Sequence, residues 1–263
     1  MDELTATQRS KRSIDRLSIE HWDYSEPELA PLVERYDRRV VYMVGRTAPV
    51  GGGHRMAHAV MPLFDARLVA HVFDKLGPDG VATFRAEYLD ACAAMADRQL
   101  AGVAGIDELA DRLDAIVAAT PLGAHPLAAA WAEVAGSSPA SRVDLAATVL
   151  RERRGESHVA VLLAHGLLGP EALILGDAWL DRDPFQGFPF YGWRGDADRD
   201  AALGRLREAG RIDADGNITQ AGRDERAAIE VLTEALETVV WSPLAEDDRV
   251  RTVELLEVAA AAL

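Results

Sequence analysis

The side chains best suited to chemistry lie in residues 151–158, "RERRGESH", where arginines and a histidine flank a glycine. Gly155 predicts a break between two helices, and Ser157 is a suitable N-cap for the second one. His158 would then lie in a first helical turn, where the helix dipole disfavours a protonated imidazole and favours an anionic ligand. On this interpretation His158 is a general base or metal ligand, and Arg154 binds a carboxylate or phosphate.

A second guanidinium is expected from Arg46, which precedes the glycine-rich loop "TAPVGGGHR". Facing the "RERRGESH" segment, Arg46 would contribute to the same anion site, so the predicted catalytic set is His158, Arg154 and Arg46. A structural interpretation is equally open. The arginines of this segment would then pair with the neighbouring glutamates at the surface, and His158 would only pack beneath them.

Two further histidines, His54 and His58 in "HRMAH", are four residues apart and would share one face of a helix. This spacing suits a two-histidine grip on zinc, iron, copper or a haem iron. No carboxylate completes a His-Glu-X-X-His motif, and the alternative is a pair of polar residues at the rim of a helix.

An aromatic segment, "DRDPFQGFPFYGWRG", places five aromatic side chains among glycines and prolines. The pattern predicts an ordered loop with a large apolar area, such as a pocket wall or an interface. We expect Phe185, Phe188, Tyr191 and Trp193 to form the wall of a ligand pocket.

Composition bounds the classes of partner. The chain has 263 residues, of which 28 are Lys or Arg and 43 are Asp or Glu, giving a net charge of −15. This average field repels phosphate backbones and anionic membranes. No apolar stretch approaches about 20 residues and the first residues lack a secretion signal, so we expect a cytoplasmic protein without a membrane partner. Cys92 is a lone cysteine and predicts no intrachain disulfide.

The elements that must position these residues are mostly helices. Apolar residues recur at helical spacing through the first half, and "DADGN" near the C-terminus predicts a hairpin between two helices. The predicted fold is mainly α, with a helical N-terminal half and a C-terminal winged-helix-like half that carries a small two-stranded wing. We divide it into a mobile or docking arm (1–20), a helical domain (21–138) and a winged-helix-like domain with C-terminal helices (139–263).

The elements that would face DNA in such a fold are acidic. One candidate recognition helix, "GPEALILGDAWL", has no Lys or Arg, and the other begins at Asp196, Asp198 and Asp200. From Trp193 to Val240 there are seven arginines and eleven acidic residues, a net charge of −4. A nucleic-acid partner is therefore not expected.

Two segments resemble an actinobacterial group of MarR-like winged-helix proteins, some of which carry the name SalK and which have no settled biochemical function. Its Leu-Arg-Glu-X-Arg-Gly-X-X-His pattern matches Leu150, Arg151, Glu152, Arg154, Gly155 and His158. Its loop of an arginine, small residues, proline and glycine matches Arg46, Ala48, Pro49 and Gly51. The resemblance covers most of the chain and implies a helix-turn-helix fold, although fold alone does not imply function.

Together these features predict a small-molecule-binding protein, with a ligand that carries an anionic group in a pocket between the halves. An enzymatic role in specialised metabolism is favoured, without an assigned reaction. The alternatives are a MarR-type ligand-responsive regulator, a metal- or haem-binding protein that uses His54 and His58, and a scaffold without ligand. The long terminal helices predict a homodimer held by apolar residues such as Leu255 and Leu256.

Overall fold

The structure, a computed structural model, describes residues 6–18, 24–183, 185 and 187–263. Within these residues it contains helices and no strand, which confirms the prediction of a mainly α fold. The helices are α1 (Ala6–Leu17), α2 (Ala30–Tyr36), α3 (Arg38–Arg46), α4 (His54–Val60), α5 (Ala66–Gln99), α6 (Ile106–Ala119), α7 (Pro126–Ala132), α8 (Pro139–Ala164), α9 (Pro170–Trp179), α10 (Phe188–Tyr191), α11 (Asp196–Glu208), α12 (Gln220–Trp241) and α13 (Glu246–Ala261).

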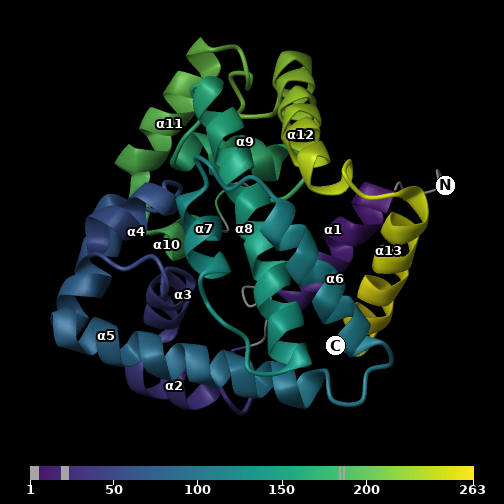
Figure 1. Ribbon diagram of the computed structural model, residues 1–263. Coiled ribbons are helices and arrows are strands. Elements are labelled where there is room, and N and C mark those ends of the chain that lie inside the picture. Colours follow the sequence, from purple (N-terminus) through teal and green to yellow (C-terminus); the bar gives the residue numbers. More distant parts are fainter. Residues whose placement is uncertain (1–5, 19–23, 184, 186) are drawn as a thin grey trace.

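Helix α8 is the central element, and α1, α5, α6, α7 and α12 pack around it (Figure 1). It begins at a capping box. The Ser138 side chain accepts from the backbone N–H of Ser141, and the Ser141 hydroxyl accepts from the backbone N–H of Ser138. Pro139 follows at the first helical position, where a missing N–H has no cost. These local signals explain why a long helix begins at this point.

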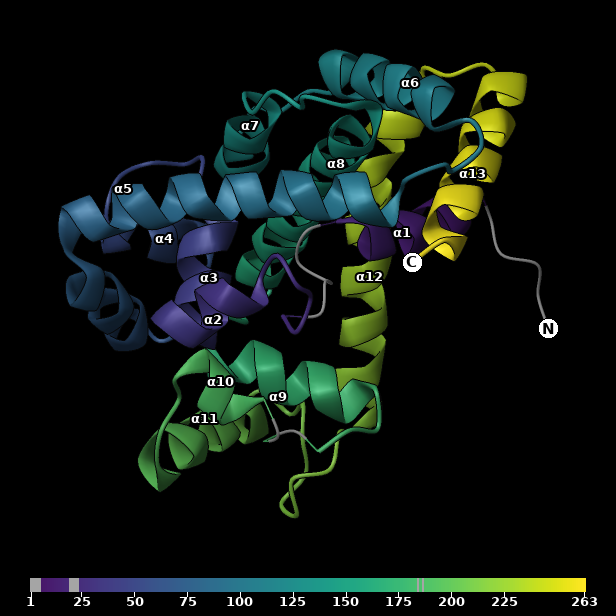
Figure 2. The ribbon, with the colours of Figure 1, turned by 90° about the horizontal axis from the view of Figure 1, so that it is seen from below.

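Three apolar clusters surround α8. The first joins it to α2–α5 and α7, and the second joins it to α1, α6, α13 and the end of α12. The third lies between the end of α8 and α9–α12. Seen from below in Figure 2, α12 runs from the α9–α11 end of the molecule to α1 and α13, and so connects the third cluster to the second.

The predicted helix break at Gly155 is wrong, because α8 continues from Pro139 to Ala164 without interruption. Ser157 is not an N-cap but a buried mid-helix residue, whose hydroxyl interacts with His125 Nε2 at 3.0 Å. A glycine in a helix interior costs about 1 kcal/mol, and the packing of α8 on five neighbouring helices outweighs that cost. His158 therefore lies in the interior of α8, far from the N-terminus of that helix.

The predicted two-stranded wing does not form. The segment between α11 and α12 has one isolated antiparallel bridge, between Ile212 and Ile218. The turn itself is as expected, since the Asp213 side chain accepts from the backbone N–H groups of Asp215 and Asn217 at 2.9 Å. Helix α12 begins at Gln220, immediately after the bridge, so no chain length is left for a longer ladder.

Part of the predicted N-terminal arm is helical: α1 packs against α13 and α8, while residues 1–5 and 19–20 lie outside the described part. The division at residues 138 and 139 stays a prediction, and α8 contacts helices on both sides of it.

Leu255 and Leu256, named above as dimer contacts, are 4% and 0% exposed in the second cluster of their own chain. They are core residues rather than contacts with another chain. None of the described helices is both long and apolar enough to span a membrane.

Candidate functional site

Side chains of α3, α5, α7 and α8, together with Ser18 and Tyr24, surround a hollow of about 10 Å³. This is room for about one water molecule, so a larger ligand enters only when the lining side chains move apart. Aromatic and polar side chains line it: Ser18, Tyr24, Tyr42, Arg46, Tyr88, Trp131, Thr148 and Glu152. Such a lining can stack on a ring and form hydrogen bonds to its substituents.

A buried ion pair forms the polar side of the hollow. Arg46 Nε and Nη2 donate to the two carboxylate oxygens of Glu152 at 3.0 and 2.7 Å, and Nη1 donates to the Tyr42 hydroxyl at 3.2 Å. The Glu152 side chain is only 2% exposed. Burial alone would lower the pKa of Arg46, but the adjacent Glu152 carboxylate and Tyr42 outweigh burial and raise it. The pair is bidentate and keeps its charges.

Aromatic residues hold this pair in place. Trp131 Nε1 donates to the backbone carbonyl of Arg46 at 3.0 Å. Gly45 allows α3 to lie against Tyr88, because a Cβ at this position would be 2.7 Å from the Tyr88 ring. Burial raises the pKa of Tyr42, and it raises the pKa of Tyr24 to about 12 despite the charge of Arg38. Both hydroxyls are therefore protonated at neutral pH and can donate hydrogen bonds.

Of the residues around this hollow, only Arg46 is among the site residues predicted from the sequence. The signal that was available is a polar line on α8: Asp144, Thr148 and Glu152 are four residues apart and all are buried. In a helix, this spacing places polar groups on one face, here against α5 and α7 rather than solvent. Burial raises the pKa of Asp144 well above its usual value, and its Oδ1 has no hydrogen-bond partner within the described part of the chain.

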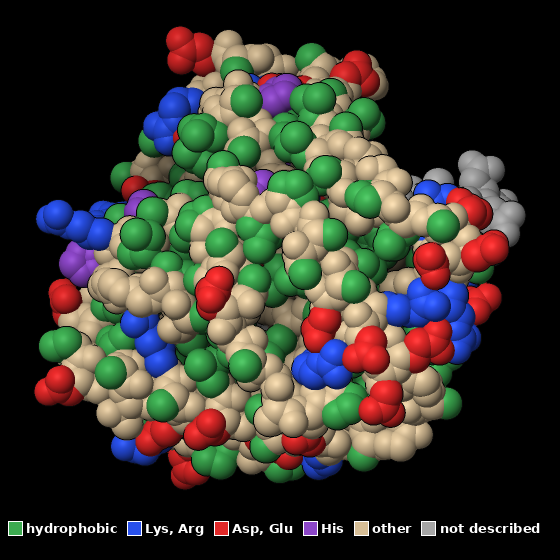
Figure 3. All heavy atoms as spheres, in the orientation of Figure 1, with side chains coloured by type: hydrophobic (Ala, Val, Ile, Leu, Met, Phe, Trp, Pro, Cys, Tyr) green, Lys and Arg blue, Asp and Glu red, His purple; other side chains and the backbone are tan. Residues whose placement is uncertain are grey.

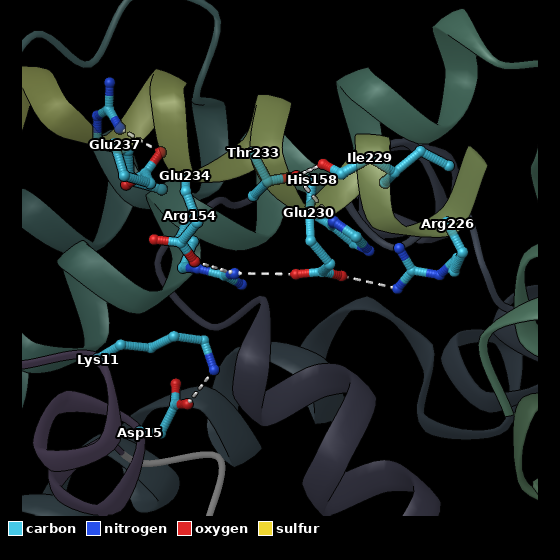
Figure 4. Close-up of polar contacts among 11 residues, drawn as sticks. Lys11, Asp15, Arg154, His158, Arg226, Ile229, Glu230, Thr233, Glu234 and Glu237 are labelled. Atoms are coloured by element: carbon cyan, nitrogen blue, oxygen red, sulfur yellow. Dashed lines mark hydrogen bonds and ion pairs between the residues drawn. The ribbon is translucent and has the colours of Figure 1, made fainter. Parts of the chain in front are cut away.

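The predicted site residues Arg154 and His158 lie elsewhere, in a polar seam between α8 and α12 (Figure 4). Arg154 Nη2 contacts Glu234 at 2.7 Å and Glu230 at 3.4 Å. Arg226 contacts Glu230 from the other side at 2.8 Å, so one carboxylate bridges two guanidinium groups. Figure 4 shows these three side chains in a row, with His158 behind Glu230.

His158 is a neutral, partly buried member of this seam. Its Nδ1–H donates to the Thr233 hydroxyl at 3.0 Å, and that hydroxyl donates to the Ile229 carbonyl at 2.8 Å. Burial lowers the pKa of His158 to about 4; the Glu230 carboxylate opposes this, while Arg226, Arg154 and Lys11 add to it. A neutral imidazole was predicted, but the cause is burial among cations rather than a helix dipole.

The structure does not bring the three predicted catalytic residues into one site. Arg46 lines the small hollow beside Tyr42 and Trp131, while Arg154 lines a different one between α1, α8 and α12. The surface pairing proposed as the alternative is also incomplete. Glu156 accepts from the backbone N–H groups of Leu127 and Ala128 at 2.9 and 3.1 Å, and so satisfies the first turn of α7.

The predicted aromatic wall packs into the cores instead of the hollow. Phe188 is buried in the third cluster and meets Phe185 edge-on, with ring centroids 5.5 Å apart. Tyr191 packs on Phe64 of the first cluster at 4.6 Å. Trp193 Nε1 donates to the Leu63 carbonyl at 3.0 Å. The segment thus connects two clusters. Phe190 of the same segment packs edge-on against Tyr42, with ring centroids 5.2 Å apart.

His54 and His58 lie on α4, as their spacing predicts, but they contact different partners. His54 Nδ1 is 4.0 Å from Asp74, and His58 Nε2 is 3.1 Å from the Phe64 carbonyl. Among the described residues, no group of three or more His, Cys, Asp or Glu side chains is placed to hold a metal ion. A metal or haem at this pair stays a prediction.

Helices α9 and α11 pack against each other, with α12 following, in the arrangement of a helix-turn-helix unit. The second of these helices would enter the major groove of DNA. Its Arg199 pairs with Asp196 and Asp200 at 2.9 and 3.4 Å, and Arg205 pairs with Glu171. Carboxylates therefore neutralise two arginines of α11 that DNA phosphates would otherwise contact.

Residues 17–263 match the model of a family described as a helix-turn-helix family. No curated protein and no solved structure matches the chain. The matched residues include all the helices except α1, whose last residue, Leu17, is the first residue matched. The chain therefore belongs to this helix-turn-helix family.

Proposed function

We propose that the protein binds a small molecule in the hollow between α3, α5, α7 and α8. The observation that carries the proposal is the buried Arg46–Glu152 pair, held by Trp131 and Tyr42 at the side of a small hollow with aromatic walls. The lining side chains have to move apart to admit the ligand, because the hollow itself holds about one water molecule. Fixed, desolvated hydrogen-bonding groups beside apolar surface are the usual composition of a binding pocket. The role in specialised metabolism that the sequence predicts would use this pocket.

The same geometry specifies the class of ligand. The charge of Arg46 is already matched by Glu152, so an added carboxylate would be buried without a counter-charge of its own. A neutral planar ring that enters when the lining side chains move apart can, in contrast, stack on Tyr88 and Trp131 and form hydrogen bonds through its substituents. We therefore replace the anionic ligand predicted from the sequence with a neutral monocyclic phenol or amide.

The helix-turn-helix unit serves as a structural part in this proposal, since α11 begins with acidic residues and two of its three arginines form ion pairs with carboxylates. The second candidate is a MarR-type regulator whose DNA affinity responds to the ligand. Membership of a helix-turn-helix family favours it. Both candidates place the ligand in the same hollow, and they differ in whether the protein binds DNA.

The test is thermal unfolding with a panel of neutral monocyclic phenols and benzamides. The control is the variant Arg46→Met/Glu152→Met, which removes the pair but keeps apolar volume, a change that proteins often tolerate without loss of stability. Members of the panel should raise the melting temperature of the wild type and leave the variant unchanged, because a bound ligand stabilises only the form that binds it. Equal shifts in both proteins, or none in the wild type, would refute the site.

A further inference from the structure

The polarity of α12 is reversed with respect to an ordinary surface helix. Its inward-facing glutamates, Glu230, Glu234 and Glu237, form ion pairs with arginines that include Arg153 and Arg154 of α8. Every exposed position from 227 to 239, in contrast, holds Ala, Val, Leu or Thr. A surface helix normally places its charges in solvent and its apolar residues on the core. The reversal indicates that the outer face of α12 is itself covered by another apolar surface.

The exposure of this face is large. Val231 is 67% exposed, Leu232 48%, Leu236 47% and Val239 37%. Exposed apolar residues of α8, with Leu163 at 59%, continue the surface beside α12. Figure 3 shows hydrophobic side chains gathered over the region where these two helices lie, with most charges at the periphery. We call this the α8–α12 face, defined by Ala160, Leu163, Ala164, Ala228, Val231, Leu232, Ala235, Leu236 and Val239.

The spacing of residues on α12 indicates what covers it. Small residues recur every seven positions at Ala221, Ala228 and Ala235 of the helix and at its C-cap Ser242, and larger ones at Leu232 and Val239 alternate with them. A seven-residue repeat is the pattern of a helix that packs lengthwise on another helix, and alanines allow close approach.

The face is also self-complementary. Val231 and Val239 lie four residues before and four after Ala235. If two α12 helices cross in antiparallel fashion at Ala235, each Val231 meets the partner's Val239, as a two-fold interface requires. Two copies of a chain with a net charge of −15 repel each other in general, and this uncharged face is where they can approach.

We propose that the protein is a homodimer in which the α8–α12 faces of two copies meet, with the α12 helices antiparallel about Ala235. The part of α12 in this face, residues 228–239, spans about 18 Å, and Ala160, Leu163 and Ala164 of α8 widen it. This apolar area forms the centre of the interface, and the more polar residues around it form the rim.

The native mass tests the occupant. The wild type should have twice the 28.4 kDa mass of the chain by light scattering at micromolar concentration. Leu232→Glu/Leu236→Glu should be monomeric and folded, because both side chains are exposed within one chain. The matched control, Val250→Glu/Val258→Glu, adds the same charge at exposed positions on α13 and should stay dimeric. A monomeric wild type, or a dimer that survives the α12 changes, would overturn the proposal.

Disulfide trapping tests the geometry independently of stability. Ala235→Cys should form an intermolecular disulfide on mild oxidation, because the two Cβ atoms face each other at the two-fold axis. Ala228→Cys is the control on the same helix, seven residues from the axis, which places its sulfur about 21 Å from its counterpart. A disulfide at position 228 and none at position 235 would refute the antiparallel pairing.

Discussion

At the scale of the residue, the seam between α8 and α12 contains a histidine, His158, whose pKa is lowered when the chain folds. His158 has a pKa of about 4 in the folded protein because it is buried near Arg226 and Arg154. In the unfolded chain the pKa returns to about 6.5. The unfolded state therefore binds more protons between these values, and the free energy of unfolding falls as the pH is lowered through this range.

We predict that the wild type loses about 2 kcal/mol of stability through His158 between pH 7 and pH 5. His158→Asn keeps a polar neighbour for the Thr233 hydroxyl but does not titrate, so it should lack this loss. Urea unfolding of both proteins at the two pH values measures the difference. Carboxylates with lowered pKa values, such as Glu225, act at lower pH and should affect both proteins alike. Parallel pH dependence in the two proteins would contradict the assignment.

At the scale of the element, the continuity of α8 determines what its residues can do. Gly155 is in mid-helix, and a Cβ added there would contact Arg46 and Glu152 at ordinary distances of 3.8 and 3.9 Å. The glycine thus has a cost in helix propensity without a conformational need.

Gly155→Ala should therefore raise the free energy of unfolding, by about 0.5–1 kcal/mol, as measured by urea denaturation. Gly222→Ala is the opposing control, because its Cβ would lie 2.3 Å from the Arg211 carbonyl oxygen and must destabilise. If Gly155→Ala were as destabilising as Gly222→Ala, α8 would be broken at Gly155 as the sequence suggests.

The helices were predictable because apolar residues recur at helical spacing and because Ser138 and Pro139 mark the start of α8. The partners of individual polar residues were not. Arg46 and Glu152 are 106 residues apart, and nothing local indicates that they form an ion pair. Likewise Gly155 and Ser157 have the local pattern of a helix junction, and only the tertiary packing of α8 overrides it.

At the scale of the whole molecule, the net charge of −15 includes acidic residues on α11, the helix that would face DNA, and these repel the phosphate backbone. We predict that fluorescence anisotropy detects no specific binding to the protein's own promoter at physiological salt, because Asp196 and Asp198 occupy the first turn of α11. A nanomolar complex that survives competitor DNA would contradict this and would favour the regulator.

The measurement closest to the central claim is calorimetric titration with two ligands of equal shape, 4-hydroxybenzamide and 4-hydroxybenzoate. Because Glu152 already balances Arg46, the wild type should bind the neutral amide at least tenfold more tightly than the anion, with one site per chain. Arg46→Met/Glu152→Met should lose the affinity for the amide. Equal affinity of the wild type for the two ligands, or unchanged binding of the amide by the variant, would contradict a ligand site at the Arg46–Glu152 pair.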